Sequence, residues 1–291
     1  MDVQFANKLD FKVSVIIPVY NAELYIEQAI ESAVNLIEVG EIILIEDGSK
    51  DNSLSMCKKL EERFEKIKLL THENNINRGA SESRNLGIQN AIFPYISFLD
   101  ADDVYCNSRF NVDKSIFTSN NSIDGVYSAV GYLDEEDGKM FYLRKVISPE
   151  ELFHFLLIGT YGHFHTNGIT LRKSVFDDVG YFSSKLILHQ DSEMWLRIAL
   201  KKKLLSGDLK NPVALIRRHE GNRIWKGQNY NTKYLLYVTF YNWVLNEKIS
   251  KYDLFLLLRR ISIYESKNNK NFYYFLLLKN CFKGLLKLKI N

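Results

Sequence analysis

Residues 13–19 of this 291-residue chain read VSVIIPV, an apolar run rich in β-branched side chains. Such a run is typical of a strand buried on both faces, as the strands of a parallel sheet are. After it, apolar side chains recur at helical spacing, at Ile26, Ile30, Ala33 and Ile37. A buried strand followed directly by an amphipathic helix is the first half of a βαβ unit.

The same alternation continues through the first hundred residues. Apolar runs at residues 41–46 (EIILIE), 67–72 (IKLLTH) and 95–99 (YISFL) predict three more strands. Helical stretches at residues 51–64 and 79–91 separate them. We therefore expect an α/β fold with a doubly wound, mostly parallel sheet of the nucleotide-binding type.

Beyond residue 104 the pattern predicts fewer elements. Residues 125–134 (GVYSAVGYLD) and 139–147 (KMFYLRKVI) are interpreted as a hairpin around a turn at residues 136–138. Pro149 predicts the start of a helix that reaches about Ile158. Another helix is expected to begin near Asp191.

Composition indicates a globular protein of a reducing compartment. The apolar fraction of 46% is ample for a core, and three distant cysteines form neither a disulfide framework nor a zinc site. Residues 1–11 lack the apolar core of a signal peptide. The longest uncharged apolar stretch, residues 234–246, has 13 residues, fewer than a spanning helix needs. We expect a cytoplasmic location.

Charge divides the chain into two parts. Residues 223–291 hold 13 lysines and arginines against 3 acids, whereas residues 1–222 hold 25 against 32. No linker or repeat marks the change, so the boundary rests on composition alone. We expect a main domain at residues 1–222 and a basic, aromatic-rich helical extension at residues 223–291.

The end of the extension predicts a basic amphipathic helix. Lys279, Lys283 and Lys287 recur every four residues among phenylalanines and leucines. Such a helix can lie on the anionic inner face of a cell membrane, as a peripheral contact. Alternatively, its apolar side packs on the domain or in a homo-oligomer. No nucleic-acid-binding motif accompanies the charge, so no nucleic-acid partner is expected.

Polar, turn-forming residues follow three of the predicted strands. They are Tyr20-Asn21, Asp47-Gly48-Ser49 and Asp100-Ala101-Asp102. Ligands of open parallel sheets bind outside the carboxyl ends of the strands, so these residues are expected to meet at one crevice. The alternative for the acidic cluster is a solvated loop.

The acidic pair suggests a metal site rather than a glycine-rich phosphate site. Asp100 and Asp102 offer the hard oxygen ligands that Mg²⁺ and Mn²⁺ prefer, and such metals are shared with substrate phosphates. Neither the glycine turn of dehydrogenases nor a P-loop is present. We therefore expect a divalent metal to neutralise the phosphates of a nucleotide.

Five segments resemble the successive motifs of family 2 glycosyltransferases of the GT-A fold. They are VSVIIPVYNAELYI (13–26), ILIEDGSKDNS (43–53), NRGASESRNLG (77–87), FLDADD (98–103) and HQDSEMWLRIAL (189–200). The resemblance spans residues 12 to about 222, and it implies a GT-A catalytic domain. It also implies inverting transfer of a sugar from a nucleotide diphosphate, usually UDP, with a divalent metal.

The resemblance implies donor-binding roles for several residues. Pro18, Val19 and Tyr20 match the segment that contacts the base, with Tyr20 beside the uracil ring. Asp47 matches the carboxylate that accepts a hydrogen bond from the imide N–H of the base. The alternatives are a core aromatic for Tyr20 and a turn residue before Gly48 for Asp47.

Arg84 matches the arginine of the family's Ala-Arg-Asn segment. The alternative for Arg84 is a structural ion pair that holds the loop of Asp100. Glu46 stands where the family often has Asp, which leaves the match of Asp47 intact.

The metal and phosphate roles fall on residues 100–102 and on a later histidine. The resemblance puts Asp100 near the ribose or a metal-bound water and Asp102 on the metal, with Ala101 between them. In IRRHEGN (216–222), His219 matches a histidine that completes the metal shell or contacts the diphosphate, although a lone histidine is more often structural. Asp103 is interpreted as a turn or helix cap.

Asp191 is the candidate general base. It matches the second acid of the family's Glu-Asp pair, while Gln190 replaces the first, whose expected role is to orient the acceptor. The alternative for Asp191 is a helix N-cap. His163 and His165 lie in a loop that is expected to border the acceptor, where histidines are also commonly inert.

Together these features predict a metal-dependent inverting glycosyltransferase. It would move a sugar from a UDP-sugar to a hydroxyl of a growing surface glycan. A sugar nucleotidyltransferase would need a basic, glycine-rich loop after the first strand, and PVYNAELY (18–25) offers none. A degenerate sugar-nucleotide-binding partner subunit would have lost the acids, yet Asp47, Asp100, Asp102 and Asp191 remain.

Overall fold

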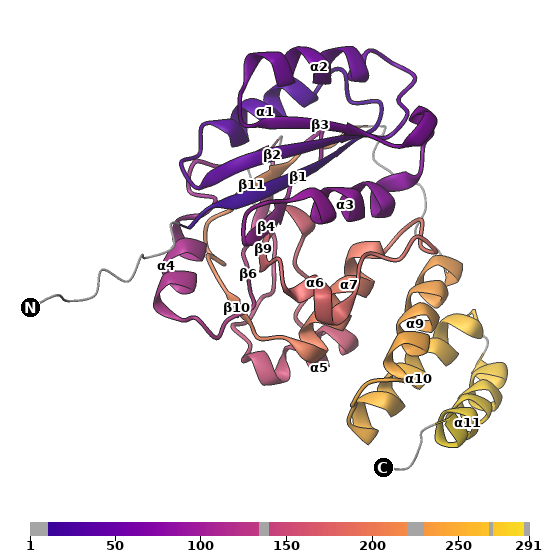
Figure 1. Ribbon diagram of the computed structural model, residues 1–291. Coiled ribbons are helices and arrows are strands. Elements are labelled where there is room, and N and C mark those ends of the chain that lie inside the picture. The colour runs from indigo at the N-terminus through magenta and orange to yellow at the C-terminus, as the bar shows by residue number, and fades with distance from the viewer. Residues whose placement is uncertain (1–10, 134–139, 220–229, 268–269, 288–291) are drawn as a thin grey trace, which may run out of the picture.

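A computed structural model describes residues 11–133, 140–219, 230–267 and 270–287 (Figure 1). The first four strands are β1 (Val13–Val19), β2 (Val39–Glu46), β3 (Ile67–Thr71) and β4 (Tyr95–Phe98). They pair in parallel in the order β3-β2-β1-β4. The predicted doubly wound, mostly parallel sheet is therefore confirmed.

Alternating side chains of the central strands explain why helices cover both faces. Val15 and Ile17 of β1 pack in one cluster with α1 (Ile26–Val34) and α2 (Ser53–Arg63). Ile16 of β1 lies in the opposite cluster, with Ile88 of α3 (Gly79–Asn90). Figure 1 shows α1 and α2 on one side of the sheet and α3 on the other.

Strands from later in the chain extend the large sheet beyond β4. They are β9 (Ile169–Arg172), β6 (Gly125–Tyr127) and β10 (Leu204–Ser206). Among them β9 runs antiparallel to both of its neighbours, β4 and β6. A smaller sheet has the order β5-β11-β7-β8, formed by β5 (Val104–Tyr105), β11 (Ala214–Ile216), β7 (Val130–Tyr132) and β8 (Met140–Phe141).

The expected hairpin of residues 125–134 and 139–147 is only partly correct. Residues 125–132 form two strands in different sheets, because the chain leaves the first ladder at Ser128 and Ala129. The backbone N–H of Ser128 donates to the carbonyl of Gly168, and that of Ala129 to the carbonyl of Asp208. Of the expected second strand at residues 139–147, only the two residues of β8 pair antiparallel with β7. The expected turn at residues 136–138 lies outside the described residues.

The remaining helices and 3-10 turns of the main domain all follow β3 in the chain. They are α4 (Asn111–Ser119), α5 (Pro149–Ile158), α6 (Val175–Val179) and α7 (Gln190–Lys201), with 3-10 turns η1 (Glu73–Asn75) and η2 (Thr166–Gly168). Pro149 is the first residue of α5, as predicted. The helix expected near Asp191 is α7.

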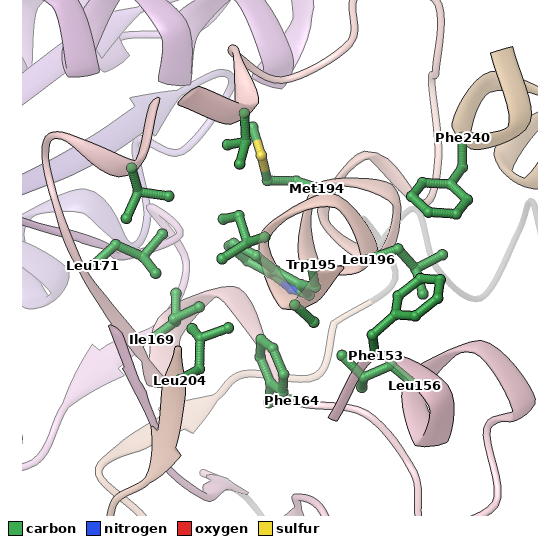
Figure 2. Packing of buried hydrophobic residues seen from close by; sticks show 14 of the residues in the cluster. Phe153, Leu156, Phe164, Ile169, Leu171, Met194, Trp195, Leu196, Leu204 and Phe240 are labelled. Carbon is green, nitrogen blue, oxygen red and sulfur yellow. The ribbon is translucent and has the colours of Figure 1, made fainter. Parts of the chain in front are cut away.

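Three C-terminal helices are joined to this domain through α5 and α7. They are α9 (Tyr230–Val244), α10 (Lys251–Glu265) and α11 (Lys270–Lys287). Figure 2 shows Phe240 of α9 close to Phe153 of α5 and Leu196 of α7, and the two phenylalanine rings lie 5.8 Å apart. Leu196 thus belongs to one hydrophobic cluster with residues of both parts of the chain.

Two expectations from the sequence fall on residues that are not described. The domain boundary near residue 222 and the segment examined for a signal peptide, except Phe11, lie outside the described ranges. Within these ranges no helix has both the length and the apolar character needed to cross a membrane.

The buried guanidinium of Arg109 connects three elements beneath the crevice. Its Nη1 is 2.8 Å from Oδ2 of Asp113 on α4, and both side chains are almost fully buried. Its Nη2 donates to Oγ of Ser97 on β4 at 2.7 Å and to the carbonyl oxygen of Ile169 on β9 at 2.8 Å. This network fixes β4 against β9, although the two strands are more than seventy residues apart.

We predict that Arg109→Met lowers the free energy of unfolding by about 3–5 kcal/mol, because it leaves the buried Asp113 carboxylate without its cation and with only the hydroxyl of Thr170 as a described side-chain partner. Arg63 is a matched control, since it pairs with Glu27 and Glu31 on the surface with half of its side chain exposed. Arg63→Met should cost about 1 kcal/mol or less. Urea unfolding of both variants tests this, and equal losses would contradict the assignment.

Candidate functional site

A cavity of about 860 Å³ opens at the carboxyl ends of β1, β2 and β4. All of the candidate residues line it: Pro18, Val19, Tyr20, Asp47, Arg84, Asp100, Ala101, Asp102, Asp191 and His219. The strand order puts these ends side by side, as expected for an open parallel sheet. The acidic cluster therefore lies in a crevice rather than on an isolated solvated loop.

Asp47 connects the end of β2 to the start of α3. Its carboxylate is 2% exposed and accepts hydrogen bonds from the backbone N–H groups of Arg78 at 2.6 Å and Gly79 at 2.9 Å. His72 Nε2 lies 3.5 Å from the same carboxylate. A carboxylate has about four acceptor positions, so a further donor can still bind to it.

The turn after β2 has space only for glycine. Gly48 has a φ of +69°, and a Cβ there would lie 2.6 Å from the carbonyl oxygen of Asn75. Glu46 stabilises the turn, because its carboxylate accepts from the backbone N–H groups of Gly48 and Ser49. Glu46 therefore has a structural contact that accounts for an acid at this position.

Arg84 pairs with the first acid of the Asp-x-Asp loop. Its Nη2 lies 2.8 Å from Oδ1 of Asp100, and the guanidinium, held on α3, is almost fully buried. Its Nε is buried and has no hydrogen-bond partner in the described part of the chain. The structural ion pair with Asp100, which was the alternative to a donor-binding role for Arg84, is thus present. Arg84 nevertheless lines the cavity.

Asn167 holds the Asp-x-Asp loop from below, and sequence reasoning missed it. Its side chain is fully buried, accepts from the backbone N–H of Asp100 at 3.1 Å and donates to Oδ2 of Asp103 at 2.6 Å. Asp103 also accepts from the backbone N–H of Arg217 at 2.8 Å. Asp103 therefore joins three segments, whereas the sequence suggested a turn or helix cap. In the sequence, Asn167 is one polar residue shortly before a strand, and no motif indicates that it supports the Asp-x-Asp loop.

Asp102 and His219 face each other at 2.8 Å between Oδ2 and Nε2. The histidine ring also packs against Tyr25, with centroids 4.9 Å apart. Burial, with the nearby carboxylate of Asp100, raises the pKa of Asp102. Burial, Asp102 and Asp100 together raise the pKa of Asp103 to about 8. Crowding of three carboxyl groups in one loop thus disfavours their ionised forms, and a bound cation would favour them again.

This donor set fits a divalent metal that is shared with a ligand. No group of three or more His, Cys, Asp or Glu side chains with the geometry of a metal site occurs among the described residues. Asp102 and His219 supply one carboxylate oxygen and one imidazole nitrogen, which suit Mn²⁺ or Mg²⁺ when phosphate oxygens complete the shell.

Asp191 lies in the first turn of α7 and lines the cavity. The N-cap of α7 is His189, so the predicted alternative that Asp191 caps this helix is wrong. The Asp191 carboxylate accepts from the backbone N–H of Ser192 at 2.7 Å. Gln190 donates to the carbonyls of Leu186 and Ile187, which secures the loop before the helix.

The C-terminal helices contribute to the same cavity, which the sequence did not indicate. Lys233 and Tyr237 of α9 and Arg260 and Tyr264 of α10 line it. His163 also lines it; its side chain is open to the solvent of the cavity, but desolvation by the surrounding protein lowers its pKa. Groups from residues 18–219 and from the extension therefore meet around one space.

Sequence comparison shows which proteins resemble this chain. Residues 14–179 match the model of glycosyl transferase family 2. The minor teichoic acid biosynthesis protein GgaA of Bacillus subtilis is 25% identical over 275 residues, which are 89% of this chain and 61% of GgaA. The glycosyltransferase GlyA of Streptococcus pneumoniae is 36% identical over 66% of this chain and 30% of GlyA. The chain thus spans less than two thirds of either relative.

Solved structures resemble the fold. The crystal structure of residues 1–349 of TarS from S. aureus, in complex with UDP-GlcNAc, has a TM-score of 0.69 at 16% identity and covers 95% of this chain and 81% of that one. The mannosyltransferase PcManGT from Pyrobaculum calidifontis, in complex with GDP-Man and Mn²⁺, has a TM-score of 0.56 at 12% identity, over 95% and 73%. The expected GT-A fold is confirmed.

We predict that Asn167→Ala destabilises the protein by about 2–3 kcal/mol, since it leaves the Asp100 N–H and one Asp103 oxygen buried without their partner. The exposed Asn120, whose side chain accepts from the backbone and hydroxyl of Ser122, is the control. Asn120→Ala should change stability by less than about 0.5 kcal/mol. Thermal and urea unfolding compare the two, and a neutral Asn167→Ala would show that the loop does not depend on this amide.

Proposed function

The chain belongs to glycosyl transferase family 2, and from this premise we propose that it transfers a sugar from a UDP-sugar to a hydroxyl of a growing surface glycan, with inversion and with a divalent metal. The observation that carries the proposal is the shared cavity, which contains both the Asp102–His219 pair and Asp191. One group of residues can bind a diphosphate there while the other activates an acceptor.

The donor end of the cavity suits a uridine nucleotide. Tyr20 is half-buried in the cavity wall, where its ring can stack on a base. The Asp47 carboxylate is held by α3 and has acceptor capacity left for the imide N–H. Arg84 is fixed by Asp100 and supplies positive charge beside the expected diphosphate. The match to the structure solved with UDP-GlcNAc supports this choice of donor.

Asp102 and His219 would hold the metal, with Asp100 close by. The bound metal would neutralise the negative charge that develops on the diphosphate as it leaves. Arg84 would add a fixed positive charge on the same side, at no cost of reorganisation, because its ion pair with Asp100 already orients it.

Asp191 is the proposed general base. It takes the proton from the acceptor hydroxyl while that oxygen forms a bond to the anomeric carbon of the donor sugar. The bond from that carbon to the diphosphate oxygen breaks, and UDP leaves with the electron pair. Because the oxygen attacks opposite to the leaving group, the configuration inverts. The Ser192 N–H contact supports this role by fixing the carboxylate in the first turn of α7.

We predict that Asp102→Asn and Asp191→Asn separate donor binding from catalysis. Asp102→Asn should abolish the Mn²⁺-dependent rise in melting temperature that UDP causes, because one metal ligand is lost. Asp191→Asn should keep that rise and lower sugar transfer by at least about 100-fold. Fluorimetric melting measures the rise in melting temperature, and a UDP-release assay measures the rate of sugar transfer. Near-native transfer by a folded Asp191→Asn variant would remove Asp191 as the base.

We further propose that the enzyme works at the inner face of the cell membrane through α11. Phe275, Leu278 and Phe282 are 62%, 74% and 66% exposed and lie on one helix. Residues 223–291 carry the positive charge that an anionic lipid surface attracts. A homo-oligomer contact through the same face is the alternative.

We predict that the protein sediments with phosphatidylglycerol vesicles at low salt and is released at high salt, and that it does not sediment with phosphatidylcholine vesicles. Leu278→Asp should abolish the binding, whereas Leu24→Asp, a change at an exposed leucine far from α11 in the chain, should not. Light scattering then tests the alternative. If the protein does not bind vesicles but forms a dimer that Leu278→Asp dissociates, the oligomer contact replaces the membrane proposal.

A further inference from the structure

The C-terminal helices bring two cations to the acceptor end of the cavity. Lys233 of α9 and Arg260 of α10 line it, and both side chains are half-buried. Tyr237 and Tyr264 stack on each other at 5.5 Å between these cations, and Lys233 Nζ lies 5.9 Å from the Tyr264 ring. We call these four residues the cationic wall.

The cationic wall lies on the side of Asp191. His163 and His189 line the same cavity as Asp191, Lys233 and Arg260. Burial lowers the pKa of both histidines, and the charges of Asp191 and Lys233 also act on both. Both Arg260 and His163 lie beside Gly159, the C-cap of α5, since a Cβ at this glycine would be 3.5 Å from Arg260 Nη2 and 3.7 Å from His163 Nε2.

The acids of the extension are engaged elsewhere. Glu247 pairs with Lys201, Asp253 with His154 and Glu265 with Lys279, at 2.9, 2.7 and 3.0 Å. No described carboxylate forms an ion pair with Lys233 or Arg260. Half-buried cations that face a cavity and form no ion pair with a described carboxylate are free to form charge-assisted hydrogen bonds to an anionic ligand. The cavity is thus electrostatically prepared for an anion beside the candidate base.

We propose that the acceptor is an anionic glycan, and that Lys233 and Arg260 bind its phosphate or carboxylate group next to the hydroxyl that Asp191 activates. This inference rests on the proposed function, since it names the substrate class of the same site. The two cations hold the acceptor at a second point, which orients the hydroxyl toward Asp191. Arg260 also donates to the carbonyl of Ile158, so its guanidinium is already fixed in the wall.

Binding of small sugars to the full-length protein, with Mg²⁺ and saturating UDP to fill the donor end, tests the proposal. Glucose 6-phosphate, glucuronate and glucose are the probes, measured by ligand-observed NMR titration. Glucose 6-phosphate or glucuronate should bind at least about tenfold more tightly than glucose, which is the factor of one charge-assisted hydrogen bond. The stronger of the two identifies the anion as phosphate or carboxylate.

Variants assign the effect to the wall. Lys233→Met should weaken binding of the charged sugar about tenfold, and Lys233→Arg should restore it. Lys251→Met removes the same charge from an exposed position at the start of α10 and should change nothing. Arg260→Lys, which keeps the charge but alters the contact with Ile158, should retain most of the affinity. The affinity for UDP should be the same in all four variants.

Three results would overturn the inference: equal affinity for glucose and the charged sugars, no effect of Lys233→Met on the charged sugar, or a loss of UDP affinity in Lys233→Met. The last would mean that the wall serves the diphosphate. Failure of the proposed function is recognised separately, because UDP would then not bind to the unmodified protein. The comparison of charged and neutral sugars without UDP would still decide the present inference.

Discussion

The antiparallel pairing of β4 with β9 is the constraint on which the site depends. β4 leads into the Asp-x-Asp loop, and Asn167 lies in η2, two residues before the start of β9, so the register of the two strands decides whether the amide can reach Asp100 and Asp103. Arg109 fixes that register from within the core by binding both strands. A buried cation of this kind is stable only with all its partners in place, and it therefore couples the fold to the position of the acids.

The acids in turn determine where the other groups lie. Asp103 accepts from the backbone of Arg217 at the end of β11, which brings His219 to Asp102. Mutually repelling carboxylates are costly in a partly buried loop, and the protein offsets this with Arg84, the amide of Asn167 and backbone N–H groups. The loop is thereby held rigid before any ligand is bound, which suits a site that must position a diphosphate.

The helical extension has two faces with different chemistry. Its inner face shares a hydrophobic cluster with α5 and α7 and carries Lys233 and Arg260 into the cavity. On α11 the outer face exposes Phe275 and its apolar neighbours. The proposed acceptor contact uses α9 and α10 and the proposed membrane contact uses α11, so the two contacts involve different helices of the extension.

The sequence by itself determined the βαβ core and the crevice at the strand ends, because strand periodicity and turn residues are local features. Its resemblance to family 2 glycosyltransferases added Arg84, Asp191 and His219 to the residues expected at that crevice, and all three line it. It could not supply Asn167, the buried Arg109 network or the cationic wall, because each depends on segments that are distant in the chain, as Asn167 and Asp103 are. It also treated residues 125–134 as one strand, since periodicity cannot show that Ser128 and Ala129 find partners outside the ladder. Only the tertiary structure decided that Lys233 and Arg260 face the cavity, because net charge along a chain does not specify which side of a helix packs inward.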